Sequence, residues 1–141
     1  AYAGIQGNAL RKKEMKMSKS FEDYLNTPDN SMMYDTQDIE ENKPWAILSY
    51  IAVLWILPLF VNGGCSKFGR FHANQGFILF LLEIACSIAC ALLGWIPLVG
   101  WIVKTVLGLA VTILMVIGIV NAATGKAKEL PFIGGLMHVF E

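Results

Sequence analysis

The sequence lacks the residue combinations from which most enzymes and metal sites are built. It holds no serine–histidine–aspartate pattern, no glycine-rich nucleotide loop and no redox-active pair of cysteines. Of its two histidines, His138 has no cysteine or carboxylate at a spacing that would complete a metal site. We therefore expect no catalytic residue, no metal and no other cofactor, and we expect the protein not to be an enzyme.

Cysteine is scarce, and the three cysteines do not form a disulfide pattern. Cys86 and Cys90 lie four positions apart in an apolar stretch, which places both on one face of a helix as small packing residues. Cys65 stands alone in a more polar segment, so no pairing follows from spacing.

An excess of positive charge is also lacking, because 11 basic residues balance 11 acidic ones. This balance argues against nucleic acid as a partner.

The charges are nevertheless unevenly distributed along the N-terminal third of the chain. Residues 1–20 contain five basic side chains and one acidic one, whereas residues 21–42 contain seven acidic side chains and no basic one. The basic stretch fits a solvated tail, and the alternative is contact with anionic lipid. We expect residues 1–43 to be a polar, flexible tail. Phe21 and Tyr24, with a leucine next to Tyr24, allow a short amphipathic helix within it.

Three long apolar runs dominate the remainder of the chain. They cover residues 45–61, 76–93 and 101–120, and each is close to the roughly 20 residues that a helix needs to cross a bilayer core. The alternative, a soluble all-α protein, would leave little polar surface. The sequence therefore predicts an all-α membrane protein in which residues 44–141 form a helical membrane domain with three transmembrane helices.

The segment that leads into the second run carries most of the polar residues near the membrane. Ser66 is a suitable N-cap for a helix. In helical geometry Lys67, Arg70 and Asn74 share one face, while the two phenylalanines between them point elsewhere. This pattern predicts an amphipathic lead-in that enters the bilayer at a shallow angle, with its cations toward headgroups and its rings toward lipid or protein.

The end of the chain and the distribution of cations bear on topology. Residues 130–140 are apolar but short and glycine-rich, so we expect an interfacial or protein-packed C-terminal segment. The cations that decide orientation are Lys67, Arg70, Lys126 and Lys128 on one side and Lys43 and Lys104 on the other. The positive-inside rule then predicts a multi-pass cell-membrane protein with its N-terminus outside and its C-terminus in the cytoplasm.

Glu83 is the one acidic residue within the apolar runs, and an ionised, unpaired carboxylate there is costly. In one interpretation it is a neutral structural carboxyl that bonds Tyr50, Thr112 or a backbone carbonyl. In the other it belongs to a substrate or proton site. His72 and Gln75 could extend a polar stripe toward it and line a water-filled path in an oligomer, although one helix holds His72 too far from Glu83 for direct contact.

Several segments resemble a bacterial membrane family that is grouped with a chloroplast inner-envelope import component, the twenty-kilodalton Tic subunit. The matching segments are 38–43, 46–50, 67–76, 97–101 and 121–131, within residues 35–134. The most specific is Phe-His-Ala-Asn-Gln-Gly at 71–76, which is not a catalytic signature. The resemblance implies a helical membrane protein, with four membrane helices and a role in protein translocation in the chloroplast relatives.

Together these observations predict a small, non-enzymatic integral membrane protein. We expect it to be a subunit or scaffold of a membrane complex, with a relation to protein transport as one expectation. The alternative is a small transporter or channel with a polar path. Expected partners are the lipid bilayer and either a second copy or a larger membrane protein. The candidate functional polar residues are Lys67, Arg70, His72, Asn74, Gln75 and Glu83.

Overall fold

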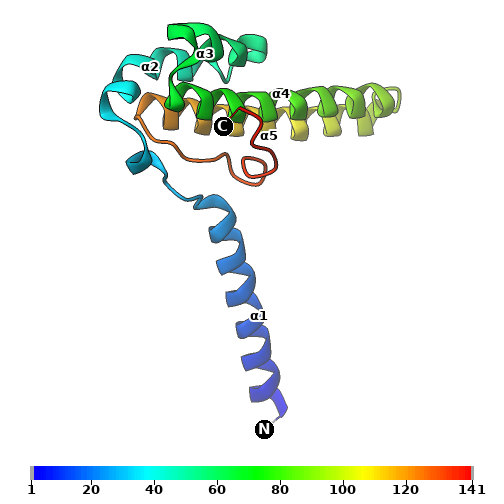
Figure 1. Ribbon diagram of the computed structural model, residues 1–141. Helices are drawn as coiled ribbons and strands as arrows, with labels where there is room; N and C mark the ends of the chain where they lie inside the picture. The colour runs from blue at the N-terminus through cyan, green and yellow to red at the C-terminus, as the bar shows by residue number, and fades with distance from the viewer. Residues whose placement is uncertain (1, 141) are drawn as a thin grey trace.

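The computed structural model describes residues 2–140. Within that range the side chains at positions 2, 18–21, 24, 62 and 63 are not described. The elements are, in chain order, α1 (Tyr2–Leu25), η1 (Ser31–Met33), α2 (Thr36–Leu48), η2 (Ala52–Ile56), α3 (Leu57–Phe60), η3 (Val61–Gly64), α4 (Lys67–Leu93) and α5 (Pro97–Ala123) (Figure 1). The predicted all-helical class is confirmed for the described part of the chain.

Helices α4 and α5 form a long antiparallel hairpin (Figure 1). Both are long and apolar enough to cross a membrane, and only 17% and 11% of their most apolar stretches is buried inside the protein. The tight turn between them depends on two glycines, because a Cβ on Gly100 would lie 2.8 Å from the Cα of Gly94. The second and third apolar runs of the sequence are therefore two candidate membrane spans, as predicted.

The first apolar run does not form one long helix, so two candidate spans are shown and the predicted third is not. Helix α2 ends at Leu48, and the chain then breaks into the short elements η2, α3 and η3. The break begins where the Ser49 hydroxyl donates to the carbonyl of His72 and the Tyr50 side chain turns toward α4. Ala52 has a positive φ of 45°. Pro58, which is disfavoured in a helix interior, then restarts the chain as α3.

The predicted amphipathic lead-in is not a separate helix. Ser66 caps α4 as expected, since its hydroxyl accepts a hydrogen bond from the Gly69 amide at 2.8 Å, and α4 then continues unbroken to Leu93. Lys67 and Arg70 are exposed, but Asn74 is fully buried, so the predicted polar face does not extend outward as far as Asn74. Tertiary packing covers this part of α4, and its rings face protein.

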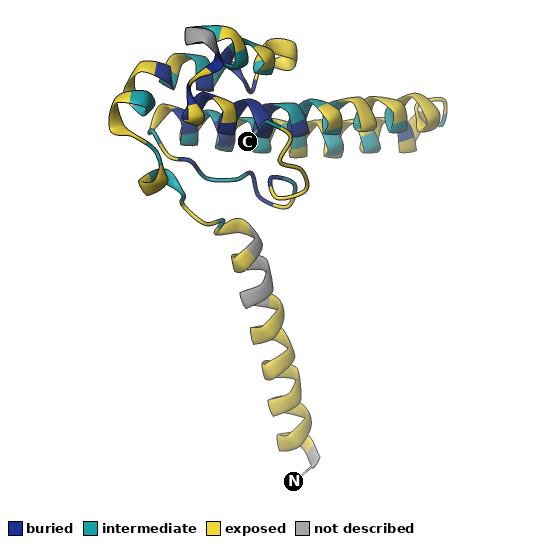
Figure 2. Cartoon of the chain, viewed as in Figure 1, coloured by how far each residue is buried: buried dark blue, intermediate teal, exposed yellow. Residues whose placement is uncertain are grey.

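Residues 2–25 form a helix where the sequence predicts a flexible tail. Helix α1 projects away from the helical body, and its described side chains are exposed (Figure 2). The amphipathic helix predicted around Phe21 and Tyr24 falls within α1, but these two side chains lie outside the described residues. The predicted boundary between a tail and a membrane domain near residue 43 stays a prediction, although α2 already packs on α4 and α5.

A compact head surrounds one end of the hairpin. Helix α2, η2, α3 and the irregular C-terminal segment, residues 124–140, cover the N-terminal half of α4, while the far half of the hairpin is mostly exposed (Figure 2). Leu130, Pro131 and Gly134 are buried in this head. The C-terminal segment is therefore packed against protein, one of the two outcomes expected from its composition.

The two flanks of the hairpin lie together, which bears on the predicted orientation. The Asn30 amide donates to the carbonyl of Ala127 at 3.0 Å, and the Thr27 hydroxyl donates to the carbonyl of Glu129 at 2.8 Å. A membrane crossed by α4 and α5 therefore has the segment before α4 and the segment after α5 on the same side. The expected arrangement, with the N-terminus outside and the C-terminus in the cytoplasm, required a third span and is not confirmed.

Candidate functional site

Three polar side chains of α4 are fully buried in the head. His72, Asn74 and Gln75 each have 0% relative exposure, although they lie within a helix that is apolar over most of its length. Buried polar groups are costly unless each finds a hydrogen-bond partner. Their partners therefore show what this motif does in the fold.

His72 joins three parts of the chain. One ring nitrogen, Nδ1, lies 2.7 Å from the Tyr50 hydroxyl, and the other, Nε2, lies 3.1 Å from the carbonyl oxygen of Lys126. A carbonyl only accepts, so Nε2 carries the proton and Nδ1 accepts from Tyr50. Burial raises the pKa of Tyr50, which keeps its hydroxyl protonated as the donor. Phe68 and Phe71 surround the imidazole edge to face.

Asn74 and Gln75 hold the C-terminal segment by pairs of bonds to its backbone. The Asn74 amide donates to the carbonyl of Met137 at 2.7 Å and accepts from the Val139 amide at 2.7 Å. Gln75 donates to the carbonyl of Gly134 at 3.1 Å and accepts from the Leu130 amide at 2.9 Å. Together with the His72 bond to Lys126, these contacts span the segment. We call His72, Asn74 and Gln75 the tail clamp.

Two glycines make room for the groups that surround the tail clamp. A Cβ on Gly76 would lie 1.9 Å from the carbonyl oxygen of Ser49, and one on Gly118 would lie 2.2 Å from the Tyr50 ring. The Ser49 hydroxyl in turn donates to the carbonyls of Ala46 and His72, at 2.6 and 3.0 Å. The end of α2 therefore packs closely against both α4 and α5.

Lys67 and Arg70 lie outside this buried network. Both are exposed on the first turn of α4, and with Met33 and Tyr34 they line a hollow of about 310 Å³. Among the described residues neither cation forms an ion pair. The sequence prediction that these two side chains face outward is confirmed.

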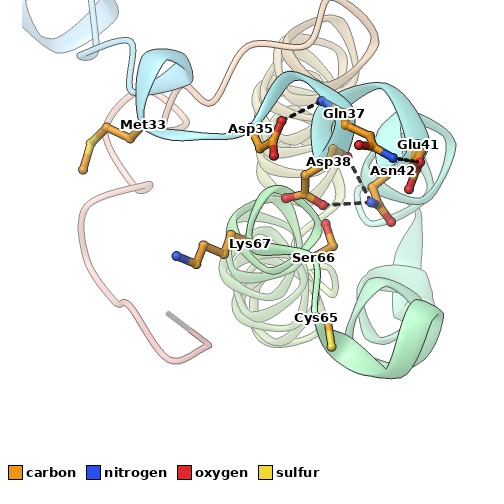
Figure 3. Close-up of a pocket in the computed structure, with 9 residues that line it drawn as sticks. All are labelled: Met33, Asp35, Gln37, Asp38, Glu41, Asn42, Cys65, Ser66 and Lys67. Atoms are coloured by element: carbon orange, nitrogen blue, oxygen red, sulfur yellow. Dashed lines mark hydrogen bonds between the residues drawn. The ribbon is translucent and has the colours of Figure 1, made fainter.

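A larger polar hollow lies next to Lys67, between α2 and the start of α4 (Figure 3). It measures about 570 Å³, and the residues that line it are Met33, Asp35, Gln37, Asp38, Glu41, Asn42, Cys65, Ser66 and Lys67. Asp38 fastens α2 to α4, because its carboxylate accepts from the Phe68 amide at 3.0 Å and from the Asn42 side chain at 2.9 Å. This link also stabilises the start of α4, where backbone amides are unpaired.

Glu83 occupies a different place from the tail clamp. It lines a hollow of about 450 Å³ between α4 and α5, together with Thr112 and Lys104. Glu83 and Thr112 lie at a similar depth along the hairpin, as predicted. The Thr112 hydroxyl, however, donates to the carbonyl of Gly108 at 2.8 Å. Tyr50, the other expected partner of Glu83, is hydrogen-bonded to His72 instead. The structure thus does not bring Glu83 together with the rest of the proposed polar path.

The polar side chains of the tail clamp are engaged within the chain itself. Each tail-clamp side chain uses its polar atoms on the chain's own backbone or on Tyr50. In the part of the chain that the structure describes, no group of three or more histidine, cysteine, aspartate or glutamate residues is placed to hold a metal. His138 lies 3.5 Å from Glu129, and the three cysteines are not in disulfides.

Sequence reasoning singled out His72, Asn74 and Gln75 as candidate polar residues, but it predicted neither their role as a clamp nor their partners. Tyr50 and Ser49 lie in an apolar run that reads as a span, and the backbone groups of residues 126–139 leave no sequence signal. The glycines at 76 and 118 could have been noticed as sites of close approach, but nothing in the sequence identifies the group that approaches each one.

Comparison with known proteins gives a consistent family. Two curated relatives, both called UPF0132 membrane proteins, come from Methanocaldococcus jannaschii. One is 33% identical over 71 residues, covering 50% of this chain and 49% of the relative, and the other is 32% identical over 102 residues, covering 72% and 89%. The chain thus spans about half the length of the first relative. No solved structure matches.

These relatives agree with the structure that the protein is a membrane protein. The comparisons do not link it to the chloroplast import component, so that part of the resemblance is not supported. The profile of one family matches residues 41–137, which include the later part of α2, the hairpin and the tail clamp. That match covers more than half of the sequence, and the chain belongs to the magnetosome magnetite crystal formation protein family.

Proposed function

We propose that this protein is a non-enzymatic membrane scaffold that anchors through the α4–α5 hairpin and presents its head at one membrane surface. The observation that carries the proposal is the tail clamp. His72, Asn74 and Gln75 are the polar residues best placed for chemistry, and their hydrogen bonds hold the chain's own C-terminal segment. Polar networks with all partners satisfied rigidify a fold and leave little capacity for a reaction.

The cations support a cytoplasmic head in a cell membrane. The basic side chains at the head end of the structure are Lys43, Lys67, Arg70, Lys126 and Lys128. At the opposite end of the hairpin Lys104 is the only basic residue near the turn. By the positive-inside rule, this asymmetry favours the head and both of its flanking segments on the cytoplasmic side.

The far half of the hairpin, which the head leaves exposed (the bare half), supports assembly with a second copy or with a larger membrane protein. Glu83, Cys86, Ser87 and Gly108 line the hollow on this half, and small residues allow close approach of helices in lipid. A covering helix would also remove the Glu83 carboxyl from direct contact with lipid. Cross-linking in native membranes, followed by identification of the linked chain by mass spectrometry, tests this partner.

A flux assay separates the scaffold from the transporter or channel. The purified protein is reconstituted in sealed vesicles, and proton and cation flux are compared with those of the Glu83→Gln variant and of empty vesicles. The scaffold predicts equal background flux in all three. Flux that depends on the protein and disappears in Glu83→Gln would contradict it and favour the polar path.

The family's description supports a more specific role in mineral formation at a membrane. The observation in this chain that favours it is the exposed acidic surface formed by Asp35, the N-cap of α2, and by Glu40 and Glu41 of α2, of which Glu40 also pairs with Lys43. Carboxylates suit hard metal cations. Magnetite precipitated in the presence of vesicles with the unmodified protein should differ in crystal size from magnetite formed with a variant neutralised at these three positions. Equal size distributions would contradict this role.

A role in protein transport rests on the sequence resemblance alone. It predicts that deletion of the gene slows export of a reporter preprotein in the native host, with normal export on re-expression. Unchanged export in the deletion strain would remove this refinement and leave the scaffold proposal in place.

A further inference from the structure

We infer that the hollow formed by Met33, Tyr34, Lys67 and Arg70 binds the phosphate of an anionic lipid headgroup in the leaflet next to the head. The hollow has a volume of about 310 Å³, large enough for a phosphate group and part of a glycerol. This binding site goes beyond the scaffold role, since it assigns a ligand to a surface that the tail clamp does not use.

The composition of the hollow suits an amphiphilic anion. Lys67 and Arg70 are three residues apart on the first turn of α4, so their cationic groups extend from neighbouring positions on one face. Arginine and lysine are the common phosphate-binding side chains, with arginine adding a two-pronged donor. Met33 and Tyr34 supply apolar surface on the other side of the hollow.

The phenol ring of Tyr34 connects this hollow to the core of the head. Its ring centroid lies 6.2 Å from that of Phe68 and 6.0 Å from that of Phe71, both in edge-to-face arrangements. Phe68 and Phe71 are buried in α4. One wall of the hollow is therefore fixed by packing, which limits the ordering that a bound headgroup would require.

The depth of the two cations identifies a lipid as the source of the phosphate. From Leu93 to Lys67, α4 rises by about 39 Å at ~1.5 Å per residue. A bilayer has a hydrocarbon core of about 30 Å and a total thickness of about 40–45 Å. With the tryptophans at 95 and 101 at one interface, Lys67 and Arg70 lie at the headgroup level of the opposite leaflet.

Neighbouring carboxylates do not pair with Lys67. Asp38 is engaged by the Phe68 amide and the Asn42 side chain, and Asp35 accepts from the Gln37 amide. Figure 3 shows the Lys67 side chain extending away from Asp38. Neither acid forms an ion pair with Lys67 in the described structure.

Native mass spectrometry of the full chain in detergent tests the inference. The protein is titrated with phosphatidylglycerol and, separately, with phosphatidylcholine, and the bound lipid is counted. We expect tighter binding of phosphatidylglycerol, weakened by about tenfold or more in the Lys67→Gln/Arg70→Gln double variant. Arg70→Lys should retain most of the affinity because it keeps the charge.

Lys126→Gln is the matched control, since it removes an exposed cation at the same end of the hairpin but outside the hollow. Its affinity should stay within about twofold of that of the unmodified protein. Equal binding of the two lipids, or an equal loss in Lys126→Gln, would overturn the inference. Displacement of phosphatidylglycerol by millimolar inorganic phosphate would also overturn it, because the site would then serve a free anion. Retained binding of phosphatidylglycerol in the double variant would also overturn the inference. The thermal unfolding midpoint of each variant confirms that it is folded.

Discussion

Asp29 and Lys128 pair in an isolated antiparallel β-bridge, which joins the segment before α2 to the segment after α5. The hairpin lies between these two residues in the sequence. A chain that crosses a membrane between two touching residues must cross it an even number of times. If α4 and α5 cross a membrane, the bridge therefore requires that the segments before α4 and after α5 meet on the same side.

Single-cysteine labelling should show this topology directly. In a background without native cysteines, Asp29→Cys and Lys126→Cys should react with an impermeant maleimide from the same side of sealed vesicles. Trp95→Cys, in the turn of the hairpin, should react only from the other side. A variant that keeps the native Cys65 as its single cysteine, exposed in the head, serves as a positive control for the first side. Labelling of positions 29 and 126 from opposite sides would contradict the fold.

A pair of glycine substitutions on α5 should separate close packing from helix propensity. Gly118→Ala places a methyl group 2.2 Å from the Tyr50 ring and should lower the free energy of unfolding by about 1–3 kcal/mol. Gly108→Ala meets no atom within 4 Å and should be neutral or slightly stabilising, because alanine favours helix. Thermal unfolding in detergent measures both. Equal effects of the two substitutions would show that Tyr50 does not pack against α5 as described.

The bond from Tyr50 to His72 should be measurable by removal of one hydroxyl. Tyr50→Phe keeps the ring but leaves the buried Nδ1 of His72 without a donor, which should cost about 1–3 kcal/mol of folding free energy. Thr112→Val is the control, because it removes an exposed hydroxyl bonded within its own helix. A Tyr50→Phe variant as stable as the unmodified protein would mean that water replaces the missing donor.

The sequence predicted the hairpin well because its signals are local. Residues 76–93 and 101–120 are long, almost uncharged runs, and Pro97 can occupy the first turn of a helix. Ser66 was also readable as a cap, since a cap depends on residues within one turn.

The failed predictions depend on contacts between distant residues. The first run matches the later two in composition, but its helix ends where Ser49 and Tyr50 bond to α4, 22 and 23 residues further along the chain. Asn74 was placed on an outer face because helical spacing does not show that the C-terminal segment covers it. A hydropathy value measures how readily a residue leaves water for an apolar environment. It therefore cannot distinguish a segment that lies in lipid from one that is buried inside the protein head.

Acidification should weaken the bridge between the two flanks. Hydrogen bonds from the Ser31 side chain and amide, in that order, lower the pKa of Asp29. A carboxyl whose folded pKa is depressed contributes stability above its unfolded pKa, and this contribution is lost as the pH falls through the folded pKa. Asp29→Ala should therefore destabilise the protein at neutral pH and make little difference below the folded pKa. Unfolding midpoints of the unmodified protein and of Asp29→Ala across a pH series test this prediction. Glu14→Ala, on the exposed α1, is the control. A difference in midpoint between Asp29→Ala and the unmodified protein that does not change with pH would contradict the prediction.

The tail clamp should determine how firmly the C-terminal segment is held. Asn74→Ala and Gln75→Ala each remove two hydrogen bonds to the backbone of residues 130–139, and their loss should expose that segment to proteases. Limited proteolysis in detergent, followed by intact-mass measurement, should show cleavage after residue 129 at least several-fold faster in both variants. Ser87→Ala, which removes a hydroxyl bonded to the carbonyl of Glu83 in the bare hairpin, should leave the rate unchanged. Cleavage at the unmodified rate in the Asn74 and Gln75 variants would show that apolar burial of Leu130 alone holds the segment.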